Sequence, residues 1–281
     1  MNVLIVLVHP ESQSFNASLT RSAQARLEAA GHAVQVSDLY GQGFNPVLNR
    51  ADYGASDERL FLLKASRERL EQNAVPDDIL AEQDKVLWAD AVIFQFPIWW
   101  FAIPAMLKGW FERVYSHGFG YGLGIYSDTR WGDRYGEGRL AGKRAMVCTT
   151  MGGMAEHYSD RGINGPIEDL LYTINHGLLF YAGFEVLEPH LIYRADHLTE
   201  ADYPAILEGW HAKVDRLFDE HPISYRLQNG GDYHVPSLRL KENLEHGSER
   251  SLFALHRRIG PQGIVPAQSE GVAALKEKAH G

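Results

Sequence analysis

Three short loops carry side chains whose types and spacing suit ligand binding. The first, HPESQSFN at residues 9–16, is rich in hydroxyl and amide groups and runs into a predicted helix. Ser14 and Asn16 can cap that helix, and the free N–H groups of its first turn would then face an anion such as phosphate. A capping loop without a ligand is the simpler alternative. The residues expected at the anion are His9, Ser14, Phe15 and Asn16.

The second loop, PIWWFAIP at residues 97–104, combines two stiffening prolines with three consecutive aromatic side chains. Three neighbouring residues cannot all face inward from a strand, so some of these rings must lie at a surface or in a cleft. A planar redox heterocycle could stack there, and a core or subunit-interface cluster is the alternative. The residues expected along such a ring are Pro97, Ile98, Trp99, Trp100 and Phe101.

The third loop, TTMGG at residues 149–153, contains two glycines that permit close approach of the backbone to a ligand. Tyr158 and Asn164 follow it. Beside a flavin, a phenol and an amide could donate hydrogen bonds to the carbonyl edge of the ring and stabilise charge that develops on reduction. As isolated residues they would be ordinary surface groups. The contacts expected from the loop itself are Thr150, Met151, Gly152 and Gly153.

The elements that must position these loops follow from hydrophobic periodicity. Apolar, β-branched runs alternate with segments of helical period, which predicts βαβ units and a parallel sheet covered on both faces. We expect strands at 2–8, 33–38, 91–96, 144–149 and 185–193, and helices at 16–30, 77–89, 166–182 and 200–220. All three loops then follow the carboxyl ends of strands, where open α/β sheets bind ligands.

The glycine pattern separates the two architectures that suit five such strands. The first βα turn contains no glycine, so the GxGxxG fingerprint of dinucleotide-binding folds is absent, and no GxxxxGK[ST] motif occurs. We therefore predict an α/β flavodoxin-like three-layer sandwich with a five-stranded parallel sheet of order 2-1-3-4-5. Residues 1–222 would form the flavin-binding catalytic domain. Residues 223–281 lack clear periodicity and are expected to form an extended C-terminal arm that contacts a second subunit.

Composition excludes several other classes of protein. The chain has 281 residues, is 45% hydrophobic and carries a net charge of −9, which argues for a sizeable core and against a nucleic-acid partner. No apolar run approaches the roughly 20 residues needed to span a bilayer, and the first residues enter a strand directly, so we expect a cytoplasmic protein without membrane insertion. The single cysteine, Cys148, lies in an apolar run and is expected to be a buried thiol.

The same motifs resemble the NAD(P)H:quinone oxidoreductase family, the long flavodoxin-fold group that includes DT-diaphorase. The resemblance is strong over residues 2–220 and weaker in the arm at FALHRRIG and IVPAQ. Its most specific part is VIFQFPIWWFAIPAMLKGWFERV at residues 92–114. The other stretches that carry it are LIVLVHPESQSFN, SDLYGQGFNPVLNR, TTMGGMAEHYSDRGINGP and GFEVLEPHLIY.

The resemblance implies roles for residues at matching positions. The first loop would hold the phosphates of FAD, with FMN the less expected cofactor, and the other two loops would flank the isoalloxazine ring. Tyr158 matches the catalytic tyrosine, and Tyr121 matches a tyrosine of the substrate pocket. NAD(P)H would be the co-substrate. The family's active site lies between two subunits, so a homodimer is implied. The expected pocket residues are Trp100, Phe101, Tyr121, Leu123 and Asn164.

Several positions depart from the family pattern. Asn164 stands where DT-diaphorase has a histidine, and an amide donates a hydrogen bond but cannot take up a proton. The sister enzyme that prefers dihydronicotinamide riboside has the same asparagine, which leaves the electron donor open. That sister also binds zinc: His176 matches one ligand, but Phe180 stands at a second, so no metal is expected. Leu123 replaces a second pocket tyrosine, and the loop at 127–138 is longer than the family's.

These expectations combine into one mechanistic hypothesis. A reduced nicotinamide would pass hydride to the flavin and leave, and a quinone would then be reduced by two electrons in the same site, a ping-pong cycle. The protein would bind, orient and exclude water, and Tyr158 with Asn164 would stabilise charge on the reduced ring. The alternatives are a regulatory subunit of an ion-efflux system, a one-electron carrier, and a reductase for azo or nitro compounds.

Overall fold

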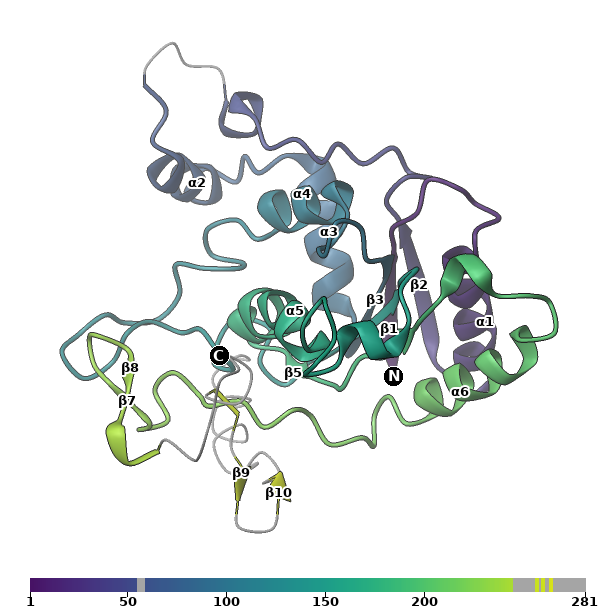
Figure 1. Ribbon diagram of the computed structural model, residues 1–281. Helices are drawn as coiled ribbons and strands as arrows, with labels where there is room; N and C mark the ends of the chain where they lie inside the picture. The colour runs from purple at the N-terminus through teal and green to yellow at the C-terminus, as the bar shows by residue number, and fades with distance from the viewer. Residues whose placement is uncertain (55–58, 245–255, 258, 261–262, 265–281) are drawn as a thin grey trace.

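The computed structural model describes residues 1–54, 59–244, 256–257, 259–260 and 263–264. Its centre is a parallel sheet between two layers of helices (Figure 1). The strands are β1 (Asn2–Leu7), β2 (Ala33–Asp38), β3 (Ala91–Pro97), β4 (Arg144–Thr150), β5 (Glu185–Val186) and β6 (His190–Ile192). Their order is β2-β1-β3-β4-β5, with β6 also paired to β4. The predicted flavodoxin-like order is confirmed.

The fifth strand differs from the prediction, which had one strand over residues 185–193. The structure divides it: β5 pairs with Arg144 and Ala145 of β4, and β6 pairs with the other end of β4, from Cys148 to Thr150. Pro189 lies between the two pieces and has no N–H to donate to a ladder. The position beside β4 is therefore filled by two short strands.

Six α-helices occur in the part of the chain that the structure describes. They are α1 (Phe15–Ala29), α2 (Leu62–Glu71), α3 (Asp77–Trp88), α4 (Ala105–Val114), α5 (Ile167–Ile174) and α6 (Tyr203–Asp215). Helices α1 and α3 were predicted to within a residue, whereas α2 and α4 were not predicted. The helix predicted at 200–220 is shorter, because α6 begins at Tyr203 with Pro204 in its first turn and ends before a series of turns.

The helix predicted at 166–182 is not regular throughout. After α5 the chain continues as a π-helix over Asn175–Phe180. Gly177 lies inside this segment, and glycine lowers the preference for regular α geometry. The wider turns accompany a cluster of rings in which His176 contacts Phe180 and Tyr225. The described 3₁₀ segments are Arg50–Tyr53, Ala155–Tyr158, Ala195–His197 and Glu242–Leu244.

Alternation along the strands divides the core between the two faces of the sheet. Leu4 and Val6 of β1 face the cluster formed with α3, α4 and α5, whereas Val3 and Ile5 face the one formed with α1 and α6. Every residue of β3 is buried, as expected for a central parallel strand with helices on both sides. Cys148 of β4 is fully buried, and burial raises the pKa of its thiol.

Helix α4 packs closely against neighbouring parts of the chain. Glu82 of α3 is only 2% exposed, and its carboxylate accepts hydrogen bonds from Ser37 Oγ at 2.6 Å and Trp110 Nε1 at 2.8 Å. This bond to Trp110 connects α3 to α4. Gly109 lies against the loop before α2, because a Cβ atom there would come 1.9 Å from the carbonyl oxygen of Pro46. The α4 helix is therefore fixed from two sides.

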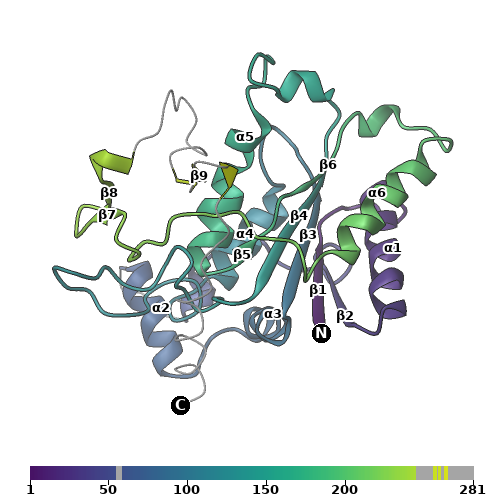
Figure 2. The same cartoon turned by 90° about the horizontal axis from the view of Figure 1, so that it is seen from below.

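Beyond α6 the chain returns to the sheet before it forms the arm (Figure 2). Ile223 N donates to Val186 O at 2.7 Å, and Tyr225, Arg226 and Gln228 are buried. A small hairpin follows, made of β7 (Tyr233–His234) and β8 (Arg239–Leu240), and a second pair is β9 (Ile259–Gly260) with β10 (Gly263–Ile264). The division at residue 222 stays a prediction, and half of FALHRRIG and all of IVPAQ except its first residue lie outside the described residues.

Within the described ranges, no helix has the length and apolar character required to cross a bilayer.

Candidate functional site

The first loop delivers its polar groups to the start of α1. Ser14 is the N-cap residue, and its side chain accepts a hydrogen bond from Ala17 N at 3.2 Å. This is the cap expected from the sequence. His9 lies beside the aromatic loop: its Nδ1 accepts from Glu11 N at 3.1 Å, and its ring lies 5.9 Å from that of Trp99. The end of β1 thus brings the start of α1, where an anion was predicted to bind, beside the aromatic loop.

Asn16 does not cap the helix, which corrects that part of the prediction. It lies in the first turn, 4% exposed, and its side chain points back to the sheet. Its Oδ1 accepts from Gln95 Nε2 at 2.8 Å, and its Nδ2 donates to Thr150 Oγ1 at 3.0 Å. Gln95 was missed by the sequence analysis, although a lone amide in the buried run AVIFQFP is a usable signal. These three side chains join the ends of β3 and β4 to α1.

The aromatic loop after β3 is a two-residue turn. Trp99 N donates to Ala102 O and Ala102 N to Trp99 O, both at 3.1 Å, so the backbone closes across Trp100 and Phe101. Both of those residues have positive φ, at 50° and 59°. Positive φ is unfavourable for bulky side chains and is expected to cost about 1 kcal/mol or more per residue. The strained turn holds Trp100 94% exposed and Phe101 54% exposed.

The glycine loop after β4 is held against the sheet and against Tyr158. Met151 N donates to Ile192 O at 2.9 Å, and Ile98 N donates to Thr150 O at 2.8 Å. A Cβ atom on Gly153 would lie 2.8 Å from the Tyr158 ring, so only glycine fits there without a shift. A Cβ on Gly152 would lie 2.6 Å from a carboxylate oxygen of Asp196.

Tyr158 ends the 3₁₀ segment Ala155–Tyr158 and is 8% exposed. Its ring lies 5.8 Å from that of Tyr193, whose pKa is raised by burial and by the nearby charge of Glu168. Asn164 N donates to His157 O at 2.9 Å, so this backbone bond brings Asn164 next to the segment that carries Tyr158. The predicted phenol and amide are therefore placed close together in the chain's fold.

The two other predicted pocket residues lie elsewhere. Tyr121 and Leu123 belong to the long loop between α4 and β4, which extends along the side of the molecule that carries β7 and β8 (Figures 1 and 2). The Tyr121 ring contacts that of His117 at 5.6 Å. Among the described residues, no hydrogen bond or ring contact connects either side chain to the loops after β3 and β4.

A groove adjoins the start of α1, and the sequence analysis did not predict it. Its volume is about 490 Å³, and it lies where Phe15 meets the segment that leads into α6. The rings of Phe15 and Tyr203 pack edge to face at 6.0 Å. The lining combines apolar side chains with two hydroxyls and a carboxylate: Phe15, Ala195, Leu198, Thr199, Glu200, Tyr203 and Ile206. The groove extends from the predicted phosphate end of the site.

No cluster of three or more histidine, cysteine, aspartate or glutamate side chains suited to a metal ion occurs among the described residues. His176, which the resemblance matched to a zinc ligand, is stacked on the rings of Tyr172 and Tyr135 at 4.7 and 4.8 Å. Burial lowers the pKa of His176 to about 3.

The strand order and the three loops at one sheet edge define a flavodoxin-like α/β protein. A family model described as a flavodoxin-like fold matches residues 1–214. The chain belongs to this group and, within it, to the NAD(P)H:quinone oxidoreductase family, and it is an oxidoreductase. The resemblance stated from the motifs is confirmed.

Individual relatives share most of their length with this chain. It is 52% identical over 261 residues to the ribosyldihydronicotinamide dehydrogenase-like protein traD of Penicillium crustosum, covering 92% of this chain and 96% of the relative. It is 35% identical over 256 residues to NAD(P)H dehydrogenase [quinone] 1 of Cavia porcellus, with 90% of each chain covered. A crystal structure from Klebsiella pneumoniae, described as that of a quinone reductase, has 48% identity and a TM-score of 0.88, with coverage of 92% and 100%.

Proposed function

We propose that this protein is an FAD-dependent NAD(P)H:quinone oxidoreductase that transfers two electrons per turnover in a ping-pong cycle. The observation that carries the proposal is the bonding of Asn16 to Gln95 and Thr150. These bonds tie the start of α1 to the ends of β3 and β4, from which the aromatic and glycine loops emerge, and a flavin that spans the three loops would require such an arrangement. The names of the relatives, which refer to quinone and dihydronicotinamide dehydrogenases, support the reaction class.

The choice of FAD over FMN rests on the groove beside Phe15. The diphosphate would bind at the start of α1, where Ser14 caps the helix and backbone N–H groups face outward. An adenosine group needs further space beyond the phosphates, and the groove of about 490 Å³ lined by Leu198, Tyr203 and Ile206 adjoins that point. FMN would leave this groove unused.

The isoalloxazine ring would lie between the aromatic turn and the glycine loop. Trp99, Trp100 and Phe101 supply ring surface, and the absence of a side chain at Gly152 and Gly153 lets the backbone approach the ring. When bound, the flavin supplies hydride acceptance and two-electron donation, chemistry that no amino-acid side chain provides. The protein's part is to bind and orient the reactants and to exclude water from them.

Tyr158 and Asn164 would donate hydrogen bonds toward the carbonyl edge of the ring. Both groups keep their protons during such a role, so the site stabilises developing negative charge without needing a histidine to take up a proton. The packing of Tyr158 on Tyr193 and against Gly153 holds the phenol in one orientation. Asn164 therefore suits electrostatic stabilisation rather than proton relay.

The acceptor pocket would be completed by a second copy of the chain. Trp100 and Phe101 are exposed, and Tyr121 and Leu123 lie on the long loop between α4 and β4, for which no hydrogen bond or ring contact to the aromatic turn is found among the described residues. In a homodimer, this loop and the arm of the partner subunit would cover the aromatic turn and form a pocket for a planar quinone. We expect the dimer to act in the cytoplasm.

The experiment that tests the proposal is an anaerobic titration of the purified protein. Cofactor released by denaturation is identified by chromatography, and NADH, NADPH and dihydronicotinamide riboside are then each added to the oxidised protein. Bleaching to the two-electron reduced form, parallel double-reciprocal plots and quinone turnover are expected. FMN as the released cofactor would contradict the FAD assignment. Stepwise one-electron bleaching, negligible quinone turnover, or faster turnover of azo and nitro acceptors would favour the alternatives.

A further inference from the structure

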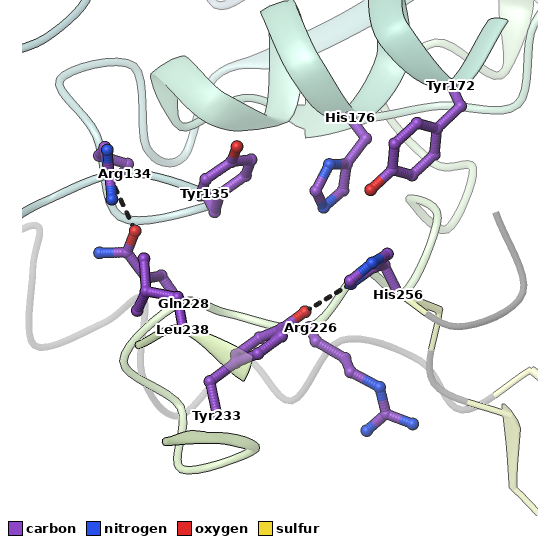
Figure 3. Close-up of a pocket in the computed structure, with 9 residues that line it drawn as sticks. All are labelled: Arg134, Tyr135, Tyr172, His176, Arg226, Gln228, Tyr233, Leu238 and His256. Carbon is purple, nitrogen blue, oxygen red and sulfur yellow. Dashed lines mark hydrogen bonds between the residues drawn. The ribbon is translucent and has the colours of Figure 1, made fainter. Parts of the chain in front are cut away.

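A second cavity lies away from the three loops of the flavin site. Its volume is about 310 Å³, at the lower end of the range for small-molecule pockets. It lies at the seam between the long loop at 127–138, the α5 and π-helix segment, and the start of the arm (Figure 3). The residues that line it are Arg134, Tyr135, Tyr172, His176, Arg226, Gln228, Tyr233, Leu238 and His256.

Aromatic rings form the walls of this cavity. The His176 ring is stacked between Tyr135 at 4.8 Å and Tyr172 at 4.7 Å, and Tyr233 closes the opposite side (Figure 3). The hydroxyl of Tyr233 is hydrogen-bonded to Nδ1 of His256 at 2.9 Å, which fixes both side chains. The space between the two walls therefore suits a flat, largely apolar ring.

Two polar groups face this space without a protein partner. His176 is only 7% exposed, and Figure 3 shows a ring nitrogen of His176 and the hydroxyl of Tyr172 pointing into the cavity. Neither group makes a hydrogen bond within the described ranges of the chain. Both groups are therefore free to bond a ligand that enters the space between the aromatic walls. The low pKa of His176 keeps its ring neutral, so it can accept a hydrogen bond from a hydroxyl.

The cavity also has a cation at one end. Arg134 donates through Nε to Gln228 Oε1 at 2.9 Å, and its guanidinium lies over the rings of Tyr135 and Tyr181. No carboxylate lies within ion-pair distance of Arg134 in the described part of the chain. Arg226, in contrast, is paired with Asp232 at 2.8 Å and points away from the gap (Figure 3). Arg134 therefore presents a planar, uncompensated positive charge, which binds carboxylates through parallel hydrogen bonds.

We propose that this cavity binds a small hydroxylated aromatic carboxylate. The ring would lie between the walls formed by Tyr135 and Tyr233, the carboxylate would meet Arg134, and the hydroxyl would bind His176 and Tyr172. A phosphate-containing ligand fits less well, because the walls are aromatic. The site depends on Arg134 and Tyr135 from the long loop, and it does not rest on the proposed function.

The test uses the full-length protein as purified and 4-hydroxybenzoate as the probe, with 4-hydroxybenzamide as its uncharged counterpart. Isothermal titration calorimetry should show the acid binding at least about 10-fold more tightly than the amide, as expected for a charge-assisted pair. Arg134→Gln should weaken acid binding about 10-fold and leave amide binding unchanged. The matched control is Arg139→Gln, which removes an exposed arginine near the same loop and should change neither.

His176→Phe tests the hydrogen bond to the ring nitrogen separately from the stacking of the ring. It keeps the stacking but should remove the preference for 4-hydroxybenzoate over benzoate. The proposal is overturned if neither probe binds at millimolar concentration, if Arg134→Gln binds the acid like the wild type, or if a quinone displaces the acid competitively. The comparison of acid with amide in the wild-type protein tests whether the cavity binds a carboxylate, even if a variant does not fold.

Discussion

Gln95 Nε2 in β3 and Asn16 Oδ1 in α1 are joined by a buried hydrogen bond of 2.8 Å. Replacing Asn16 with leucine keeps the approximate size of the side chain but leaves the amide of Gln95 and the hydroxyl of Thr150 without this partner. We expect Asn16→Leu to lower the free energy of unfolding by about 3 kcal/mol, since each buried orphan costs about 1–3 kcal/mol. Urea denaturation measures this effect, and flavin content should fall with it. Gln13→Leu, at an exposed position of the same loop, is the control and should retain both.

The aromatic turn should show a conflict between stability and function. Phe101→Gly removes a side chain at positive φ, so the cofactor-free protein should gain about 1 kcal/mol of unfolding free energy. Loss of ring surface should at the same time weaken flavin retention. Ala102→Gly, outside the positive-φ pair, should destabilise instead. If Phe101→Gly is less stable than the wild type, the strain inferred from the backbone is absent.

Tyr158→Phe should slow reduction of the bound flavin about 10- to 100-fold, because one hydrogen-bond donor to developing charge is removed while the ring packing stays. Rapid-mixing absorbance measurements with a saturating nicotinamide donor follow this step directly. Tyr193→Phe provides the comparison, since it alters the hydroxyl of the ring that packs on Tyr158. A Tyr158→Phe rate equal to that of the wild type would remove the phenol from the mechanism.

His190 should make stability depend on pH. Its pKa is lowered to about 4 by burial and by the charge of Lys213, below the ordinary value of 6.5. The unfolded chain therefore binds a proton more readily, and this histidine's contribution is complete above about pH 6.5 and is lost as the pH falls toward 4. His190→Phe keeps a ring on Trp210 and should flatten this part of the pH profile. Unfolding free energies of both proteins between pH 7 and 4 test this, and parallel profiles would contradict it.

Gly109→Ala should be costly although it lies within a helix. The added methyl group would meet the carbonyl oxygen of Pro46, a backbone atom that cannot rotate away. We expect a loss of about 3 kcal/mol or more, because overpacking here must shift α4 or the loop before α2. Thermal unfolding gives the measurement. Gly177→Ala, where nothing lies near the missing Cβ, should have little effect or stabilise the protein.

The sheet could be predicted because its signals are local. Runs such as NVLIVL and AVIFQFP are continuous and apolar, and their order along the chain implies the parallel arrangement. The break in the last strand depends on Pro189, whose effect decides between one strand and two only when the pairing with β4 is known. Helix α4 was not predicted because AMLKGWFERV at residues 105–114 was considered only as part of the family motif and not for its helical period.

The loops of the site could be located, but not their contacts. Asn16 and Thr150 are 134 residues apart, and no local pattern pairs them. The positive φ values at Trp100 and Phe101 run against the usual preference for glycine or asparagine, so the sequence favours no such turn. The groove beside Phe15 also depends on residues from two distant segments.

The aromatic turn is closed entirely by backbone bonds between Trp99 and Ala102. The side chains at its tip therefore contribute nothing to its closure, and the sheet beneath them does not depend on their identity. Substitution of the side chains at positions 100 and 101 therefore leaves these two backbone hydrogen bonds in place. In the proposed enzyme, a lineage or a designer could therefore vary the ring surface that this tip offers to the flavin and its acceptor while the sheet stays folded.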